Sequence, residues 1–162
     1  VLAGDMEEPD DDCEAEHMAC AAELLSAAGY ERYEVASYAK PGYQCKHNIA
    51  YWTGVPYLGL GLSAATMTQN SERRMRKKDG VVTDDLNVAQ MRAEDLMLSM
   101  RMAQGVSVQD VDRAECVLPR VRETFDELCD LGLCICIDGR FRPTDTGWLC
   151  GNELYGRIFD LA

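Results

Sequence analysis

Apolar and polar positions repeat with different periods along the chain, and the period changes from one segment to the next. Over residues 11–28 the apolar spacing is that of a helix, with Met18, Leu24 and Leu25 directed toward a core. Gly29 follows as a stop signal, because glycine adopts the left-handed conformation that ends helices. The pattern therefore predicts an amino-terminal helix.

Three further segments before residue 86 have the character of strands and turns. "YERYEVASY", residues 30–38, alternates apolar and charged positions and predicts one strand. Residues 40–54 follow as a loop, and "YLGLGLSA", residues 57–64, predicts a second strand whose alternate glycines let a backbone or ligand approach. Asp79-Gly80 predicts a hairpin turn.

The second half of the chain is mainly helical. Helical spacing extends over residues 88–102, Ser107 marks the start of a short helix, and Pro119 fits the first turn of a third. Asp138-Gly139 predicts another hairpin, and a last helix, with Leu149, Leu154, Ile158 and Phe159 on its apolar side, runs almost to the end. Three helices, a two-stranded wing and a helix predict a winged-helix-like unit, with a boundary near residue 86.

The charge balance narrows the range of partners. The net charge is −12, from 16 basic and 28 acidic residues, which argues against nucleic acid or an anionic membrane as the main partner. Only "RRMRKK", residues 73–78, runs against this balance, and such a run is usually a solvated face. No apolar stretch has the length of a membrane span, and no signal peptide is recognisable.

The cysteines give no sign of a metal centre. There are eight, with irregular spacings and no CxxC pair, whereas zinc and iron–sulfur sites need clustered ligands. Many unpaired thiols predict a reducing, cytoplasmic location. A disulfide scaffold is the less favoured alternative for a chain of 162 residues.

"KPGYQCKHNIAYWTG", residues 40–54, gathers the chain's ligand-capable and aromatic side chains. His47 on a loop is an available metal or haem-iron ligand, and Tyr51 and Trp52 offer flat surfaces to a macrocycle. The alternative is structural: Asn48 caps a turn and the aromatic rings anchor the loop. Composition alone leaves both open. Elsewhere no serine nucleophile or dinucleotide fingerprint is present.

A longer pattern carries a family resemblance. "YAKPG", "HNIAYW" and "YLGLGLSA" occur in this order, followed by "EDLMLSMRMAQGVS" and "RPTDTGWLCGNEL". Over nearly the whole chain the sequence resembles the radical S-adenosylmethionine (radical SAM) family of oxygen-independent coproporphyrinogen III oxidases and their haem-chaperone relatives. The resemblance implies an α/β fold: residues 1–86 would hold the last strands of a partial radical SAM barrel, and residues 87–162 a winged-helix-like domain.

The resemblance also implies cofactors and sites. The family's CxxxCxxC motif, which binds a [4Fe-4S] cluster, is missing, so the chain is expected to be a carboxy-terminal fragment, inactive alone. Ala65, with Gly59 and Gly61, would lie beside S-adenosylmethionine. The resemblance implies that the porphyrin or haem site is formed by His47, Asn48, Tyr51 and Trp52.

The sequence is compatible with three functions. The resemblance favours a haem chaperone that passes haem to a recipient protein in the cytoplasm. The first alternative is anaerobic oxidative decarboxylation of coproporphyrinogen III to protoporphyrinogen IX by the full-length protein. The second is a winged-helix interaction module without enzymatic activity. Exposed strand edges in such a piece would favour association between copies.

Overall fold

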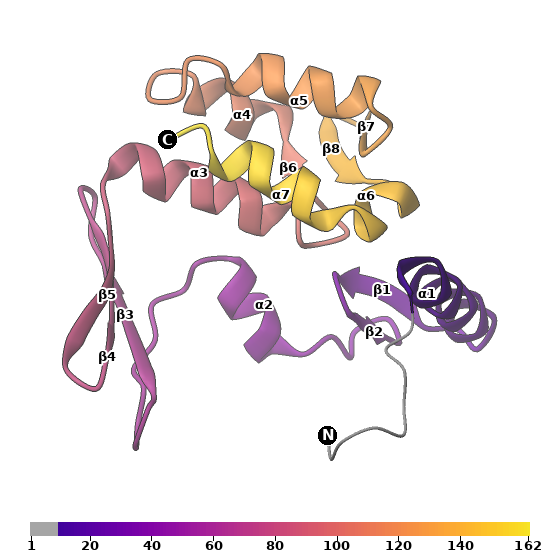
Figure 1. Ribbon diagram of the computed structural model, residues 1–162, viewed down its shortest axis with the longest axis horizontal. Coiled ribbons are helices and arrows are strands. Elements are labelled where there is room, and N and C mark those ends of the chain that lie inside the picture. Colours follow the sequence, from indigo (N-terminus) through magenta and orange to yellow (C-terminus); the bar gives the residue numbers. More distant parts are fainter. Residues whose placement is uncertain (1–9) are drawn as a thin grey trace. The chain divides into compact units, whose positions relative to one another are not determined.

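The computed structural model describes residues 10–162, which have a mixed α/β structure of short helices and small antiparallel sheets (Figure 1). The chain divides into two compact units, Val1–Gln44 and Cys45–Ala162. The boundary predicted near residue 86 therefore falls inside the second unit. No helix within residues 10–162 is long and apolar enough to cross a membrane.

The first unit begins with helix α1, Asp11–Ala27, as the apolar spacing predicts. Asp10 caps the helix by accepting a hydrogen bond from the backbone N–H of Cys13 (2.8 Å). None of the residues of α1 is buried, and Met18 and Leu24 are 39% and 68% exposed. The predicted core contacts of these two side chains are therefore wrong, and among the described residues the main neighbour of α1 is the short strand β1.

That hairpin replaces the single strand predicted for residues 30–38. Strands β1, Glu31–Glu34, and β2, Ser37–Ala39, pair antiparallel, so the predicted single strand is wrong. The alternation of apolar and polar residues continues across the turn, which is why the sequence pattern does not reveal it. Arg32 Nε donates to the Tyr38 hydroxyl across the pair (2.8 Å).

The second unit begins with helix α2, Lys46–Trp52. A three-stranded antiparallel sheet follows, in the order β3 (Ala65–Gln69), β4 (Arg74–Lys78) and β5 (Val81–Leu86). The predicted hairpin at Asp79-Gly80 is confirmed, since it joins β4 to β5 with both residues at positive φ.

The strand predicted over residues 57–64 is wrong. Only Tyr57 makes a bridge, to Met67 of β3, and the regular strand starts later, at residue 65. Gly61 (φ +97°) and Ser63 (φ +62°) lie in the left-handed region, which is incompatible with an extended strand. The segment is therefore a loop that folds back beside β3.

The remaining elements alternate helices with a second small sheet. They are α3 (Val88–Ser99), β6 (Val106–Ser107), α4 (Val108–Ala114), α5 (Val121–Asp130), β7 (Cys134–Ile137), β8 (Arg140–Pro143), α6 (Asp145–Leu149) and α7 (Gly151–Phe159). The strands pair antiparallel in the order β6-β8-β7, and the hairpin at Asp138-Gly139 is confirmed. Ser107 accepts from the backbone N–H of Asp110 (3.1 Å), which confirms the predicted start of α4.

The predicted last helix is two helices, α6 and α7, separated at Cys150. Leu154 and Ile158 are buried as predicted, whereas Leu149 and Phe159 are 47% and 44% exposed. At Cys150 (φ −93°, ψ 35°) the backbone leaves the helical conformation, so the apolar stripe predicted for one helix is interrupted there. The core of this region is centred on Phe125 and Phe141, whose ring centroids are 4.8 Å apart, and α7 packs beside α3 (Figure 1).

Candidate functional site

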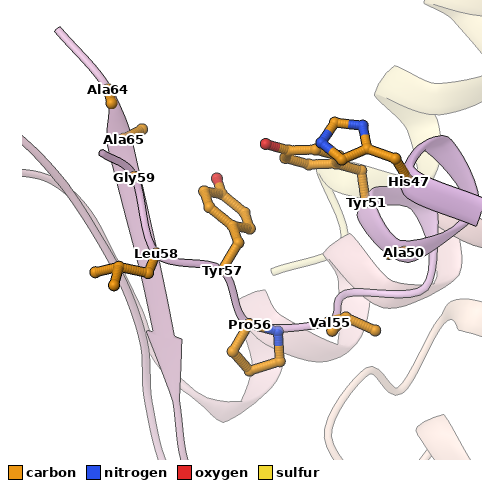
Figure 2. A pocket seen from close by; sticks show the side chains of 10 residues that line it. All are labelled: His47, Ala50, Tyr51, Val55, Pro56, Tyr57, Leu58, Gly59, Ala64 and Ala65. Atoms are coloured by element: carbon orange, nitrogen blue, oxygen red, sulfur yellow. The ribbon is translucent and has the colours of Figure 1, made fainter. Parts of the chain in front are cut away.

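The candidate site is a pocket of about 430 Å³ between α2 and the loop that precedes β3 (Figure 2). The lining residues are His47, Ala50, Tyr51, Val55, Pro56, Tyr57, Leu58, Gly59, Ala64 and Ala65. Four residues singled out from the sequence therefore share one pocket: His47, Tyr51, Gly59 and Ala65. The other three, Asn48, Trp52 and Gly61, do not line it.

The segment "HNIAYW" is helical, so the predicted loop is wrong at these positions. Pro41, Gly42 and Gly54 favour turns at the two ends of residues 40–54. Taken over all fifteen residues, the composition therefore indicated a loop and concealed the helix between the turns. The residue spacing does contain the helical signal. His47 and Tyr51 are four residues apart, as are Asn48 and Trp52, and such pairs share one face of a helix.

The first face carries a row of rings. The His47 and Tyr51 ring centroids lie 4.9 Å apart at an interplanar angle of 70°, an edge-to-face contact. Tyr57, from the following loop, continues the row at 4.8 Å from Tyr51 (Figure 2). His47 is exposed, so its imidazole is accessible at the mouth of the pocket. The pocket thus combines apolar ring faces with one ligand-capable nitrogen.

The second face of α2 holds the helix in place. The Arg101 guanidinium lies over the Trp52 ring at 5.3 Å and over the Tyr155 ring at 4.4 Å. Cation–π contacts of this kind join α2 to α3's carboxy-terminal end and to α7. Asn48 lies one turn before Trp52 on the same face. In this structure Trp52 therefore positions α2 and does not form a pocket wall.

Gly59 shows what the glycine-rich loop accommodates. A Cβ at this position would lie 2.2 Å from the Ala65 carbonyl oxygen, so only glycine permits the close approach of the two backbones. The Gly59 N–H also donates to the Thr66 hydroxyl (3.0 Å). The space beside Gly59 is filled by the chain's own backbone, in line with the close approach predicted from the glycine spacing.

A buried arginine connects the pocket loop to the sheet and to α3. Arg74 is 2% exposed, and its guanidinium donates to Glu94 (2.5 Å) and Asp95 (2.6 Å) of α3. Its Nε donates to Gln69 Oε1 (2.8 Å), while Gln69 Nε2 donates to the Gly54 carbonyl just after α2 (3.2 Å). Arg74 thus joins β4 to α3 directly and, through Gln69, to the chain just after α2.

A second arginine of the sheet is held by α3. Burial acts to lower the pKa of Arg76, but Glu94 and, to a lesser degree, the nearby Tyr57 raise it overall, so the guanidinium stays charged. Arg76 Nη1 lies 2.9 Å from a Glu94 carboxylate oxygen. The position of Arg76 on β4 is therefore fixed by Glu94.

Tyr57 is the functional candidate that the sequence reasoning missed. Assigned to the first position of a predicted strand, it had no distinguishing signal. Its role depends on the fold, which brings its ring against Tyr51 and pairs its backbone with Met67 of β3. Within residues 10–162 no group of three or more His, Cys, Asp or Glu side chains is arranged to hold a metal ion.

Comparison with known proteins finds relatives that share one name. The resemblance predicted from "HNIAYW" and its neighbours is confirmed, because relatives of that family match much of this chain at 31% identity. These relatives carry the name heme chaperone HemW. The Mycobacterium tuberculosis (strain H37Rv) protein is 31% identical over 128 residues, 71% of this chain and 33% of the relative.

Two other relatives show how the similarity is distributed. The Escherichia coli (strain K12) heme chaperone HemW is 50% identical over 56 residues, 35% of this chain and 15% of the relative. The Lactococcus lactis protein of the same name is 25% identical over 169 residues, 93% of this chain and 43% of the relative. The chain thus spans less than half the length of these relatives. No protein-family model and no solved structure matches it.

Proposed function

We propose that this chain is the carboxy-terminal part of a haem chaperone, in which the pocket beside α2 holds haem before its transfer to a recipient protein. The observation that carries the proposal is the exposed imidazole of His47 at the mouth of a pocket walled by Tyr51 and Tyr57. Relatives named heme chaperone support the same function. Haem is here the cargo and not a resident cofactor.

Each side chain has a role in this proposal. A ring nitrogen of His47 coordinates the haem iron, which imidazole does in many haem proteins. The Tyr51 and Tyr57 rings contact the apolar face of the macrocycle, and backbone hydrogen bonds with Met67 keep Tyr57 in place. The pocket volume of about 430 Å³ lies within the roughly 300–1,000 Å³ usual for small-molecule sites. Asn48 and Trp52 support the site by fixing α2.

The fold of the longer protein is part of the proposal. Residues 1–86 would belong to a partial radical SAM barrel and residues 87–162 to a winged-helix-like domain. The order α3-β6-α4-α5-β7-β8, with a three-stranded antiparallel sheet, supports the second assignment. Support for the barrel comes from the family resemblance alone.

The cofactors of radical SAM proteins fit this chain only in part. Ala65 and Gly59 line the pocket and remain candidates for contact with S-adenosylmethionine, and Gly61 lies on the same loop outside the lining. The described residues provide no set of ligands for a [4Fe-4S] cluster, so no chemical step is assigned to one.

A haem-accepting protein is the proposed partner, with no role for nucleic acid. The arginines of the basic run 73–78 already pair with carboxylates: Arg73 with Asp85, Arg74 with Glu94, and Arg76 with Asp84 and Glu94. Their charge is therefore balanced within the protein. The eight free cysteines support a cytoplasmic location.

The test is a haem titration of the chain followed by absorption spectroscopy. We expect His47→Ala to weaken haem binding at least about tenfold and to shift the Soret band, because the iron loses its imidazole ligand. His17→Ala is the matched control, since it removes the only other histidine, from helix α1. Unchanged affinity and an unchanged Soret band in His47→Ala would refute the role of His47.

A further inference from the structure

Two cysteine side chains meet in the helical region, away from the pocket. The Sγ atoms of Cys129, near the end of α5, and Cys134, at the start of β7, lie 3.1 Å apart. The chain between them turns sharply and returns to the same place. Within residues 10–162 this is the one pair of cysteine sulfurs found in contact, and Cys136 follows Cys134 two residues later in β7.

The two thiols differ in their exposure to solvent. Cys134 is 2% exposed, and its thiol is within reach of the Phe125 carbonyl (3.8 Å). Cys129 is only partly buried, so a reagent in solution has access to one sulfur of the pair. Burial raises the pKa of the Cys129 thiol, and the hydrogen bonds from Cys134 and from the Cys136 backbone oppose this effect.

We propose that Cys129 and Cys134 are a redox modification site that forms a reversible disulfide. With oxidised glutathione as the oxidant, the Cys129 thiolate attacks one glutathione sulfur, and the glutathione disulfide bond breaks to release one glutathione thiol. The Cys134 thiolate then attacks the Cys129 sulfur and displaces the second glutathione. Two protein thiols lose two electrons and two protons, and one glutathione disulfide gains them.

The fold requires little adjustment to form this bond. A disulfide joins its sulfurs at about 2.05 Å, so the two atoms need to approach by roughly 1 Å. The bond would tie the last turn of α5 to the first residue of β7, next to the buried Phe125. Cytoplasmic disulfides are mostly transient and redox-sensing, which agrees with the reversible character of the site.

Peptide mapping of the whole chain tests the proposal. The chain is incubated with excess oxidised glutathione, free thiols are alkylated, and the protein is cut with trypsin. Residues 123–140 form one tryptic peptide that contains Cys129, Cys134 and Cys136, so the experiment is done in Cys136→Ser as well as in the unaltered chain. We expect this peptide to lose two hydrogen atoms and to resist alkylation at least about tenfold more than the Cys116 peptide.

The controls distinguish the pair from general thiol oxidation. Cys129→Ser removes the partly exposed member and should leave Cys134 reduced, while Cys20→Ser, on α1, should leave the disulfide unchanged. Dithiothreitol should restore both thiols. In the oxidised chain the midpoint of thermal unfolding should rise by about 5 °C, since the cross-link restricts the unfolded state.

Two results would overturn the proposal. One is full alkylation of Cys129 and Cys134 under conditions that oxidise Cys20 or Cys116. The other is a Cys129–Cys136 link that forms in the unaltered chain while Cys134 stays free. Neither result bears on haem binding by His47, so the two proposals stand or fall separately.

Discussion

The pocket region, residues 45–86, and the helical region, residues 88–159, belong to one unit but are stabilised by different means. The largest fully buried side chains all come from the helical region: Phe125, Phe141, Met100, Leu118, Leu128, Leu154, Ile158, Val111 and Val121. In the pocket region, Met67 is the one buried apolar side chain among the described residues. The helical region is thus held by a hydrophobic core, whereas the pocket region depends on charged groups.

The contrast extends to what each region exposes. Leu58, Leu60 and Leu62 are 74%, 83% and 96% exposed, although leucine is among the residues most often found inside proteins. The ion pairs of Arg74 and Arg76 with Glu94 connect this region to α3. A region with few buried apolar contacts is expected to open at lower free energy than its neighbour.

The largest effect is expected in the hydrophobic core. Phe125→Ala removes a ring that is completely buried against Phe141, and should lower the free energy of unfolding by about 3–5 kcal/mol. Urea unfolding followed by circular dichroism measures the loss. A variant as stable as the unaltered chain would contradict the assignment of the core to the helical region.

A smaller, pH-dependent effect is expected at Glu94. Burial acts to raise the pKa of Glu94, but hydrogen bonds with Arg76 and Arg74 lower it overall below its ordinary value of 4.5. Because the folded-state pKa is the lower one, the carboxylate stabilises the folded chain above pH 4.5, and this contribution is lost as the pH falls through the folded-state value.

Glu94→Gln should therefore be less stable than the unaltered chain at pH 7, by about 2–3 kcal/mol, since it removes the carboxylate that Arg74 and Arg76 share. The difference between the two chains should shrink as the pH falls below 4.5, because the carboxylate becomes protonated as the pH passes through its lowered folded-state pKa. Urea unfolding of both at a series of pH values is the measurement. A difference that persists undiminished to pH 3 would show that Glu94 acts by packing and not by charge.

The smallest effect is expected on the exposed leucines. Leu60→Ser should change the free energy of unfolding by less than about 0.5 kcal/mol, because the side chain has few contacts to lose. The measurement is the same urea titration, with Leu128→Ser as a buried leucine for comparison. A loss at Leu60 close to that at Leu128 would mean that the leucine is covered in solution.

Local signals in the sequence were sufficient where the structure is itself local. The Asp-Gly hairpins at residues 79–80 and 138–139 and the Ser107 cap depend on a few neighbouring residues, and the structure has all three. The strand predicted over residues 57–64 failed for the opposite reason. Its apolar alternation is real, but the positive φ angles of Gly61 and Ser63 end the extended backbone.

The sequence indicated most of the residues of the candidate site but not how they are arranged in space. The family resemblance singled out His47, Tyr51, Gly59 and Ala65, and these line one pocket. It did not indicate Tyr57, because this ring joins the site only when the loop after α2 folds back and places it against Tyr51. The buried pairing of Arg74 was equally hidden, since a basic run in a sequence normally indicates a solvated face.

Helix α2 has seven residues, just under two turns. Within this length it carries both the pocket face, with His47 and Tyr51, and the face on which Trp52 contacts Arg101. A rotation of the helix about its axis that re-aims the His47 imidazole turns Trp52 through the same angle against Arg101. The six residues "HNIAYW" thus couple the orientation of the His47 imidazole to the position of Trp52. The orientation of the imidazole therefore depends on the Arg101–Trp52 contact on another face of the helix as well as on Tyr51 in the pocket.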